Sequence, residues 1–309
     1  MSKENTAVTK KKIKRCKEDV VFDAACFIIL TLVLFVVAYP LYWVIISSIS
    51  APSAVSSGKV LLHPIGFTLK GYAEVFKNDQ VMRGFLNSLI ITFCGVMVNL
   101  IVTLPTSYAL SRSNFSGKKP ITIFYLITMF FSGGLIPPYL VIQRLQMLNT
   151  IWALILPGCL SVYNMIVART FFKSNISEEL YEAAEIDGCT QARFFFQIAL
   201  PLSKAIIAIL VLYYGVGHWN SYFSALVYIS DKAKYPLQLV LRNILITNQT
   251  ALSQTATTAA ARAALQEKQQ LIDVMKYSLI IISSIPVLVM YPLVQKHFVK
   301  GVMIGSMKG

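Results

Sequence analysis

The chain has 309 residues, of which 56% are hydrophobic and 14% charged, and its mean hydropathy is +0.63. This balance excludes an ordinary soluble domain and favours a membrane protein. The formal net charge is +14, but the sequence has no motif for DNA or RNA recognition. We therefore expect the positive residues to orient the chain in the membrane and to contact anionic lipid headgroups, and we expect no nucleic-acid binding.

Long windows without Lys, Arg, Asp or Glu recur along the whole chain, and each can hold the roughly 20 residues that cross a bilayer core. A charge at the bilayer centre costs about 2.5–3.5 kcal/mol on insertion scales, so this pattern predicts membrane spans. We therefore expect an all-α integral membrane protein with six transmembrane helices. Their expected cores are residues 25–47, 86–110, 121–142, 150–170, 205–228 and 277–296.

The first window follows a basic segment, and residues 1–20 are expected to form a cytoplasmic tail. Its apolar run is too long for the roughly 7–15 residue core of a cleaved signal peptide, and no small-residue cleavage site is evident, so we favour a retained anchor. Six crossings return the C-terminus to the cytoplasm. The expected organisation is a transmembrane domain over residues 21–300 and a cytoplasmic tail over 301–309.

A charged, helix-forming stretch at about 172–204 separates the fourth and fifth windows. Ser177 is the expected N-cap of a short helix, with two glutamates in its first turn where the helix dipole favours negative charge. Gly188 is expected to end that helix. A second helix is expected to run from Thr190 to Pro201. The alternative is an amphipathic loop that lies on the membrane surface.

Polar and aromatic residues gather near the fifth window, where lipid alone would favour Leu and Val. Three of them, Tyr214, His218 and Tyr222, are spaced to share one helix face. Polar groups inside a membrane helix face a bundle interior or a watery cavity, so we expect a substrate pathway here. Its candidate residues are Tyr214, His218, Trp219, Asn220 and Tyr222.

Two further candidates for this pathway, Tyr163 and Asn164, lie midway along the fourth window. Helix–helix hydrogen bonding is the alternative role for these two. For the fifth window, the alternative is an interfacial aromatic belt with His218 packed between helices.

No catalytic constellation is evident in the sequence. The five cysteines form no CxxC pair and the three histidines are scattered, so we expect neither a metal site nor disulfides. The stretch Ser116–Lys119 lacks the upstream glycine and the following Ser or Thr of a phosphate-binding loop. The chain is therefore expected to carry out no covalent chemistry and to bind no cofactor itself.

The charged stretch resembles the coupling loop of binding-protein-dependent ABC importer permeases. The resemblance rests on Glu182-Ala183-Ala184, Gly188 and Ile198-x-Leu200-Pro201 at the family's spacing, and it extends over nearly all of the chain. It implies a type I ABC importer permease fold. The residues that it implies for coupling to the ATPase are Glu182, Ala183, Ala184, Asp187, Gly188 and Arg193.

Two other segments resemble carbohydrate permeases of the same superfamily. Residues 215–222 are similar to a segment near the fifth span of those permeases, and residues 295–309 to the C-terminus of their second-type subunit, typified by the smaller maltose permease. A closer likeness is to permeases of Gram-positive bacteria that import complex oligosaccharides, including pectin-derived ones. The resemblance implies that Gly305, Lys308 and Gly309 contact the ATPase.

Together these resemblances imply the transmembrane permease subunit of an ATP-driven carbohydrate importer in the bacterial cytoplasmic membrane. The implied partners are a second homologous permease, two cytoplasmic ATPase subunits, an extracellular solute-binding protein and the carbohydrate, which is expected to be an oligosaccharide. An importer permease for peptides or amino acids is the nearer alternative, because the coupling motif is shared. The other alternative is a membrane protein outside the ATP-driven transporters, such as a scaffold or a channel.

Overall fold

The computed structural model describes residues 17–250 and 259–305, and this part of the chain is helical without strands. The all-α expectation is therefore confirmed for the described residues. The longest helices are α1 (Lys17–Ser48), α4 (Asp79–Ser111) and α15 (Ala259–Gly305). The others are α2 (Pro52–Ser56), α3 (Lys70–Lys77), α5 (Lys118–Phe130), α6 (Ile136–Arg144), α7 (Trp152–Ile155), α8 (Val162–Asn175), α9 (Glu178–Ile186), α10 (Gln191–Phe194), α11 (Leu200–Leu202), α12 (Lys204–Trp219), α13 (Phe223–Tyr228) and α14 (Leu237–Thr250).

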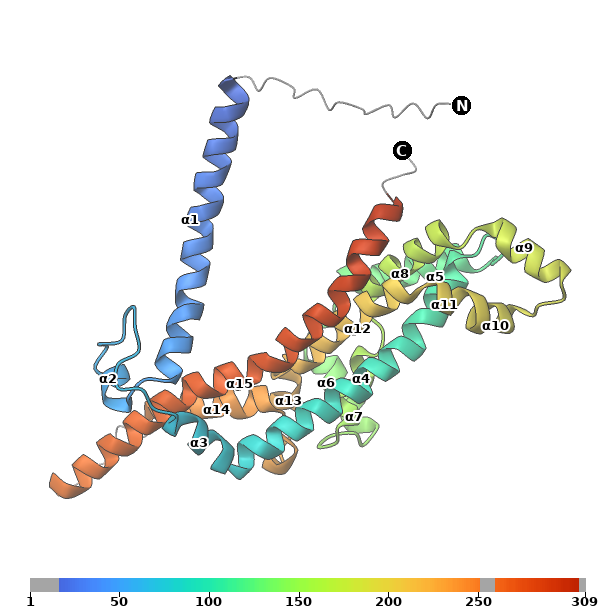
Figure 1. Ribbon diagram of the computed structural model, residues 1–309. Coiled ribbons are helices and arrows are strands. Elements are labelled where there is room, and N and C mark those ends of the chain that lie inside the picture. The colour runs from blue at the N-terminus through green and yellow to red at the C-terminus, as the bar shows by residue number, and fades with distance from the viewer. Residues whose placement is uncertain (1–16, 251–258, 306–309) are drawn as a thin grey trace.

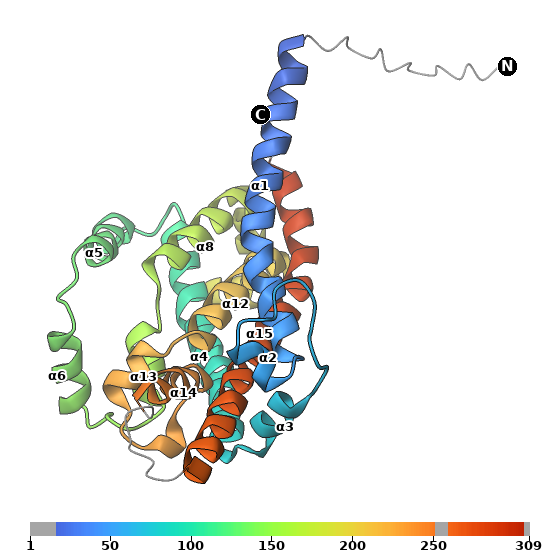
Figure 2. The same ribbon diagram turned by 90° about the vertical axis from the view of Figure 1, so that its left-hand side faces the viewer.

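The core of the molecule is formed around α4, which packs against α12, α8 and α14, while α15 runs along α12, α14 and α3 (Figures 1 and 2). Two main groups of buried apolar side chains fill these contacts. One joins α4, α8 and α12 to the segment of α9 and α10. The other surrounds Trp219 between α4, α14 and α15. The bundle therefore places the charged segment of α9 at one end of α4.

Helix α1 stands apart from the bundle along most of its length, as Figure 1 shows. Its buried residues are Ile46, Ser47 and Ser48, all in the last turn. There the Trp43 indole donates to the backbone oxygen of Val60 at 2.8 Å. The remaining turns expose Leu, Ile, Val and Phe side chains. Such a surface requires an apolar environment, from lipid or from another membrane helix.

The described helices only partly match the six predicted spans. Three are long and apolar enough to cross a membrane: α1, α4 and the stretch Gln269–Pro292 of α15. Two more crossings result if each of two bent helix pairs is one span. These pairs are Trp152–Gly158 with Val162–Asn175, bent by 51°, and Gln191–Leu202 with Lys204–Trp219, bent by 80°.

The third predicted span, residues 121–142, is not one helix. Helix α5 has 13 residues and ends at Phe130, and α6 starts again at Ile136. Gly134 lies in the break between these two helices and has a φ of +79°. Glycine adopts such a positive φ without strain, so it permits the chain to turn there. At 1.5 Å per residue, α5 is about 20 Å long and shorter than the bilayer core.

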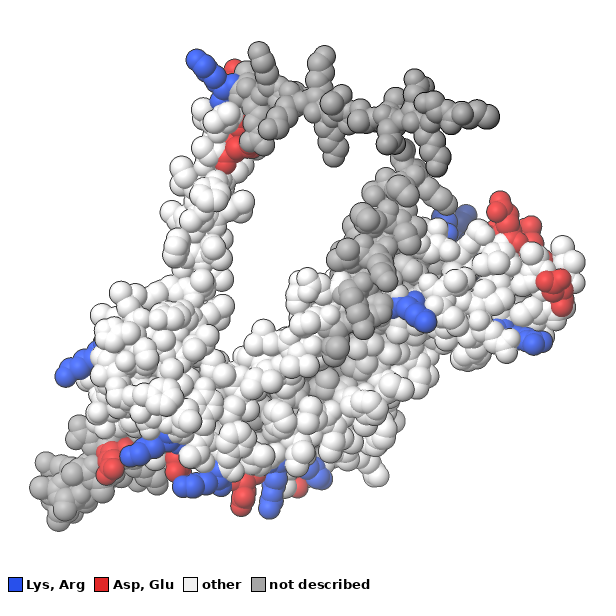
Figure 3. Space-filling view, in the orientation of Figure 1, with Lys and Arg blue, Asp and Glu red and all other residues white. Residues whose placement is uncertain are grey.

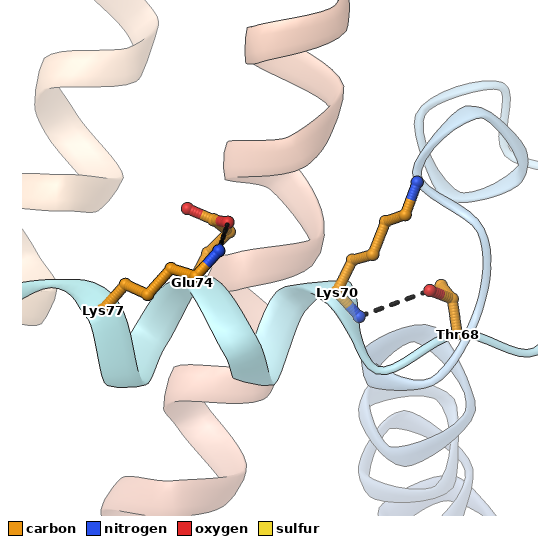
Figure 4. A network of polar contacts seen from close by, with 4 residues as sticks. All are labelled: Thr68, Lys70, Glu74 and Lys77. Carbon is orange, nitrogen blue, oxygen red and sulfur yellow. Dashed lines mark hydrogen bonds and ion pairs between the residues drawn. The ribbon is translucent and has the colours of Figure 1, made fainter.

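In the view of Figure 3, charged side chains gather at the start of α1, at the end of the molecule near α3 and at the opposite end with α9, and the surface between these places is largely uncharged. One charged end includes α3, where Lys77 forms an ion pair with Glu74 at 3.4 Å (Figure 4). The Thr68 hydroxyl oxygen there accepts from the Lys70 backbone N–H at 3.3 Å. The other charged end carries α9 and α10. An uncharged surface between two charged ends fits a protein that crosses a membrane.

Candidate functional site

The charged segment forms two short helices joined by a tight turn. Ser177 caps α9, because its hydroxyl oxygen accepts from the Leu180 backbone N–H at 3.3 Å, and Thr190 caps α10 through the Arg193 N–H at 3.3 Å. The second helix continues beyond α10 through a π-helical turn, Phe195–Ala199, to α11. The predicted helix–turn–helix at this segment, including both ends, is present.

Gly188 closes α9 in the left-handed conformation, with a φ of +77°. The Cys189 N–H donates to the Ala184 oxygen at 2.9 Å and the Gly188 N–H to the Glu185 oxygen at 3.0 Å. These bonds satisfy carbonyls that the helix end leaves without a partner. An added Cβ at Gly188 would meet no atom within 4 Å. Glycine is therefore required here by the backbone angle and not by crowding.

An aromatic cluster anchors this helix pair to the end of α4. The rings of Tyr181 and Phe194 meet edge-on at 5.3 Å between centroids, and Tyr108 of α4 lies 5.0 Å from Phe195 and 5.7 Å from Phe172. All five rings are buried. A helix of nine residues is marginal alone, so this packing stabilises α9.

The outer face of α9 is exposed and mixed in character. Ile186 exposes 87% of its surface and Leu180 is also exposed, which leaves two large apolar side chains without cover in this chain. Acidic side chains beside them are visible at the α9 end in Figure 3. Among the predicted coupling residues, Glu182, Ala183, Asp187, Gly188 and Arg193 are exposed and Ala184 is half-buried.

A second polar region joins α12 to α4 beside the bend between α7 and α8. The His218 Nε2 lies 2.7 Å from Asn99 Oδ1, and Asn99 Nδ2 donates to the Gly158 oxygen at 2.7 Å. An amide oxygen only accepts, so Nε2 of His218 carries the proton. One turn away, the hydroxyls of Thr103 and Tyr214 lie 2.7 Å apart. These bonds tie three segments together.

This arrangement corrects part of the predicted substrate pathway. Trp219 is 2% exposed, its Nε1 donates to the Ser283 oxygen at 2.8 Å, and its ring packs edge-on against Phe85. Trp219 therefore fills the core and does not face a passage in this structure. The helix also ends at Trp219, so Tyr222 does not continue the face of Tyr214 and His218.

The other pathway candidates divide into buried and exposed residues. Tyr214 and Asn164 are buried and His218 is half-buried, whereas Asn220, Tyr222 and Tyr163 are exposed. The Tyr214 hydroxyl also accepts from the Ser161 N–H at 3.2 Å. The polar atoms of Tyr214 and His218 thus bond to groups of this chain, and for His218 this agrees with the alternative in which it packs between helices.

The residues of α4 that meet this region were not among the predicted pathway residues. Asn99, Thr103, Ser107 and Ser111 are spaced four apart in an apolar helix and all are buried. Their spacing of four residues places them on one face of the helix. Such a polar face on an apolar helix predicts a buried polar contact with another helix. Gly95 continues that face, and an added Cβ there would lie 2.5 Å from His218 Nε2.

The predicted C-terminal contacts cannot be placed in the same way. Helix α15 ends at Gly305, and Lys308 and Gly309 lie outside the described residues.

Residues 79–304 match the family model described as the binding-protein-dependent transport system inner membrane component. The chain belongs to this family. The match includes the helix–turn–helix of α9 and α10, the polar region of α4 and α12, and both bent spans. The predicted permease family is thereby confirmed.

Two relatives from Bacillus subtilis align with this permease almost end to end. One is the polygalacturonan/rhamnogalacturonan transport system permease protein YtcP, 36% identical over 93% of this chain and 98% of its own. The other is the galactooligosaccharides transport system permease protein GanQ, 30% identical over 92% of this chain and 94% of its own.

A solved structure supports the same fold for the permease. It is a chain of a bacterial ABC transporter involved in the import of the acidic polysaccharide alginate, with a TM-score of 0.82 and 27% identity over 93% of this chain and 99% of that chain. This permease is therefore a multi-pass inner-membrane protein with the type I ABC permease fold. It is a transport subunit and not an enzyme, and ATP hydrolysis belongs to a separate chain.

Proposed function

We propose that this permease forms half of the passage in an ATP-driven importer for a carbohydrate, taken up as an oligosaccharide. The printed functions of its relatives support this cargo, because pectin-type polysaccharides, galactooligosaccharides and alginate are all carbohydrates. The helix–turn–helix of α9 and α10 carries the proposal. Its exposed apolar residues lie at the end of a sharply bent span, where a motor protein can apply force.

The proposed machine contains four kinds of subunit. A second, homologous permease forms the other half of the passage, and two ATPase subunits bind ATP and Mg in the cytoplasm. A solute-binding protein outside the cell delivers the sugar. The exposed length of α1 fits a position against lipid or the second permease, because its apolar side chains have no cover in this chain.

The proposed topology has six crossings, with both termini and α9 in the cytoplasm. In this arrangement α5 and α6 together form the third crossing, with the break at residues 131–135 near its outer end. The short α5 has no buried residue in this chain, and it is proposed to be covered by lipid or partner helices. The topology is tested by introducing one cysteine at Gly134 or Ile186 into a variant whose five native cysteines are replaced by serine, and by measuring its accessibility to an impermeant reagent. Labelling of both positions from one side would overturn the topology.

The proposed mechanism begins when ATP closes the two ATPase subunits and moves α9. The aromatic cluster of Tyr181, Phe194 and Tyr108 carries that movement to α4, and the 80° bend before α12 redirects it toward the passage. The exposed side chains of Asn220, Tyr222 and Tyr163 are the proposed lining. Aromatic rings stack on the apolar faces of sugars, and the amide binds hydroxyls.

Co-purification with the ATPase tests the proposed coupling surface. We expect Ile186→Ser to reduce ATPase association and uptake while the subunit still inserts, because Ile186 is the most exposed apolar side chain of α9. Phe67→Ser is the matched control, since Phe67 is 72% exposed near α3 at the other end of the molecule. Recovery of equal amounts of ATPase with both variants would show that α9 is not part of the interface.

The cargo is tested separately with the cognate solute-binding protein. We expect this protein to bind oligosaccharides and, when loaded, to stimulate ATP hydrolysis by the assembled transporter. Binding of peptides or amino acids in place of sugars would establish the alternative cargo while leaving the importer assignment intact.

A further inference from the structure

Residues 59–64, between α2 and α3, fold back along the last turns of α1, and we call them the returning segment (Figure 1). Three consecutive carbonyls of this segment accept hydrogen bonds from aromatic side chains of α1. The donor and acceptor pairs are Trp43 with Val60 at 2.8 Å, Tyr42 with Leu62 at 2.6 Å and Tyr39 with Leu61 at 3.4 Å. The three donors are spaced to lie on one face of α1. The returning segment therefore lies against a helix that is long and apolar enough to cross a membrane.

The returning segment is fixed in place and holds two leucines outward. Val60 is buried in an apolar cluster, and the Lys59 backbone N–H donates to the Ala54 oxygen at 3.1 Å. Leu61 and Leu62, in contrast, expose 60% and 69% of their surface. Because the backbone is tied down at these residues, the two leucines stay turned away from the described part of the chain. Their apolar side chains need an apolar environment outside it.

The position of α1 in a bilayer places the returning segment at the edge of the apolar core. Asp23 is the last charged residue before the apolar run of α1. Since roughly 20 residues cross the core, a crossing that starts at Ala24 ends at about Trp43. Tyr39, Tyr42 and Trp43 then occupy the last turns of the crossing, near the level at which Tyr and Trp are enriched in membrane proteins. The returning segment is bonded to all three and lies at the same level.

We propose that the returning segment is inserted into the lipid leaflet at the Ser48 end of α1, with Leu61 and Leu62 among the acyl chains and Lys59 at the headgroup phosphates. The bonded carbonyls support this placement. If the segment lay in solvent, water would supply their donors. In a leaflet the donors have to come from the protein, because acyl chains supply none, and α1 provides three.

The charges around the returning segment favour an anionic lipid leaflet over a protein partner. Between Asp23 and Glu74 the chain has no acidic residue, and its only Lys or Arg residues are Lys59 and Lys70, both exposed. Basic side chains are attracted to anionic headgroups. Lys59 stands directly before the apolar residues, so its long side chain can reach a phosphate while the leucines enter the acyl region. The exposed apolar surface of α1 continues that of the leucines.

An inserted returning segment would fix the depth and the tilt of α1. Most of this helix stands apart from the bundle, and its buried residues are in the last turn (Figure 1). The bonds from Tyr39, Tyr42 and Trp43 then connect the helix to the leaflet through the returning segment. Under the proposed topology this is the outer leaflet. That choice of leaflet rests on the proposed function, whereas insertion itself does not.

Spin labelling of the assembled transporter in lipid vesicles tests the insertion. A nitroxide is attached to a cysteine in place of Leu62, in a transporter whose native cysteines are replaced by serine. Its collision rates with oxygen and with a water-soluble nickel chelate are then compared. We expect oxygen to collide with this label more often than the chelate does, because oxygen concentrates among acyl chains. Gln80→Cys is the matched control, since Gln80 is exposed between Asp79 and Arg83, and there the order should be reversed.

Two outcomes at Leu62 would overturn the insertion. More frequent collisions with the chelate than with oxygen would place the returning segment in water. Low collision rates with both reagents would show that a protein covers the segment, either the second permease or the solute-binding protein.

Tyr42→Phe tests the role of the bonded carbonyls. It removes the donor to the Leu62 oxygen, and the label at Leu62 should move toward the water, because that carbonyl then needs another donor. Tyr39→Phe is the matched control, since its bond is long at 3.4 Å and its loss should shift the label less. An unshifted label in Tyr42→Phe would overturn the role of this hydroxyl in holding the segment.

Lys59 tests the contact with headgroups, in vesicles of phosphatidylcholine with and without phosphatidylglycerol. When phosphatidylglycerol is present, Lys59→Glu should move the Leu62 label toward the water, because like charges repel, and Lys59→Gln should move it less. Equal label depth in both variants and both lipids would overturn the contact of Lys59 with anionic headgroups. These depths are measured without sugar, so a failure of the proposed carbohydrate import leaves them unaffected.

Discussion

The imidazole of His218 and the amide of Asn99 face each other between α12 and α4, with Nε2 2.7 Å from Oδ1. Because Asn99 also donates to the Gly158 oxygen, the pair joins α12 to the bend between α7 and α8. Interhelical hydrogen bonds of this kind contribute about 0.5–2 kcal/mol each in membrane proteins. The contact between His218 and Asn99 is therefore a structural link between the two bent helix pairs.

We expect Asn99→Ala to lower the thermal unfolding temperature of the detergent-solubilised transporter, because it leaves His218 and the Gly158 oxygen without their partner. His218→Ala should lower it too, and the double variant should lose less than the sum of the two. Asn220→Ala, at an exposed residue, is the control and should unfold as the unchanged protein does. Additive losses would show that His218 and Asn99 act independently.

Gly95→Ala should destabilise the protein by about 1–3 kcal/mol, because the new methyl group would overlap the His218 ring. Gly217→Ala is the matched control on the facing helix, since an added Cβ there meets nothing within 4 Å. That substitution should be neutral or slightly stabilising. Thermal unfolding followed by size-exclusion chromatography compares the two. A tolerated Gly95→Ala would mean that α12 has room to shift.

Trp219→Ala should lower the free energy of unfolding by about 3–5 kcal/mol, because the Trp219 side chain is enclosed by Phe85 and α15. Tyr222→Ala should act on transport, because its side chain is 43% exposed and is proposed to line the passage. Uptake normalised to membrane abundance, together with thermal unfolding, separates the two effects. Normal uptake per inserted molecule in Tyr222→Ala would place Tyr222 outside the passage.

Gly188→Val should abolish uptake without preventing membrane insertion, because a β-branched residue resists the left-handed conformation that ends α9. Gly188→Asn should retain more uptake, since Asn tolerates this conformation better. Both variants add side chains to open space, so the comparison isolates backbone strain. Equal uptake by the two variants would contradict a requirement for this helix end. Sugar-stimulated ATP hydrolysis by the reconstituted transporter gives the second readout.

The sequence predicted the helix–turn–helix well because its signals are local. Ser177, Gly188 and Thr190 each act within a few residues of the backbone that they cap or turn, so one segment of sequence holds the whole cause. The apolar windows likewise predicted α1, α4 and the stretch Gln269–Pro292 of α15. A window of the same kind at 121–142 is broken between α5 and α6, so a long uncharged run alone does not ensure one continuous helix.

The polar contacts were harder to predict because they depend on tertiary packing. Asn99 and His218 are 119 residues apart in the chain, and nothing near either residue identifies the other. Trp219 and Tyr222 were assigned to one region from composition, but α12 ends between them and the two side chains enter different surroundings. The burial of Arg112 also arises only when α8 and α9 return to the end of α4.

The aromatic cluster at the end of α4 has a mechanical consequence. The Tyr108 ring packs against Phe172 of α8, Phe194 at the end of α10 and the adjoining Phe195, and Tyr181 of α9 joins the cluster through Phe194. Close-packed rings have little compressibility, so in the proposed mechanism a displacement of α9 moves the end of α4 with it. The two short helices and the end of α4 would then act as one rigid lever, and a smaller side chain in place of any one ring would leave a cavity that takes up part of the displacement.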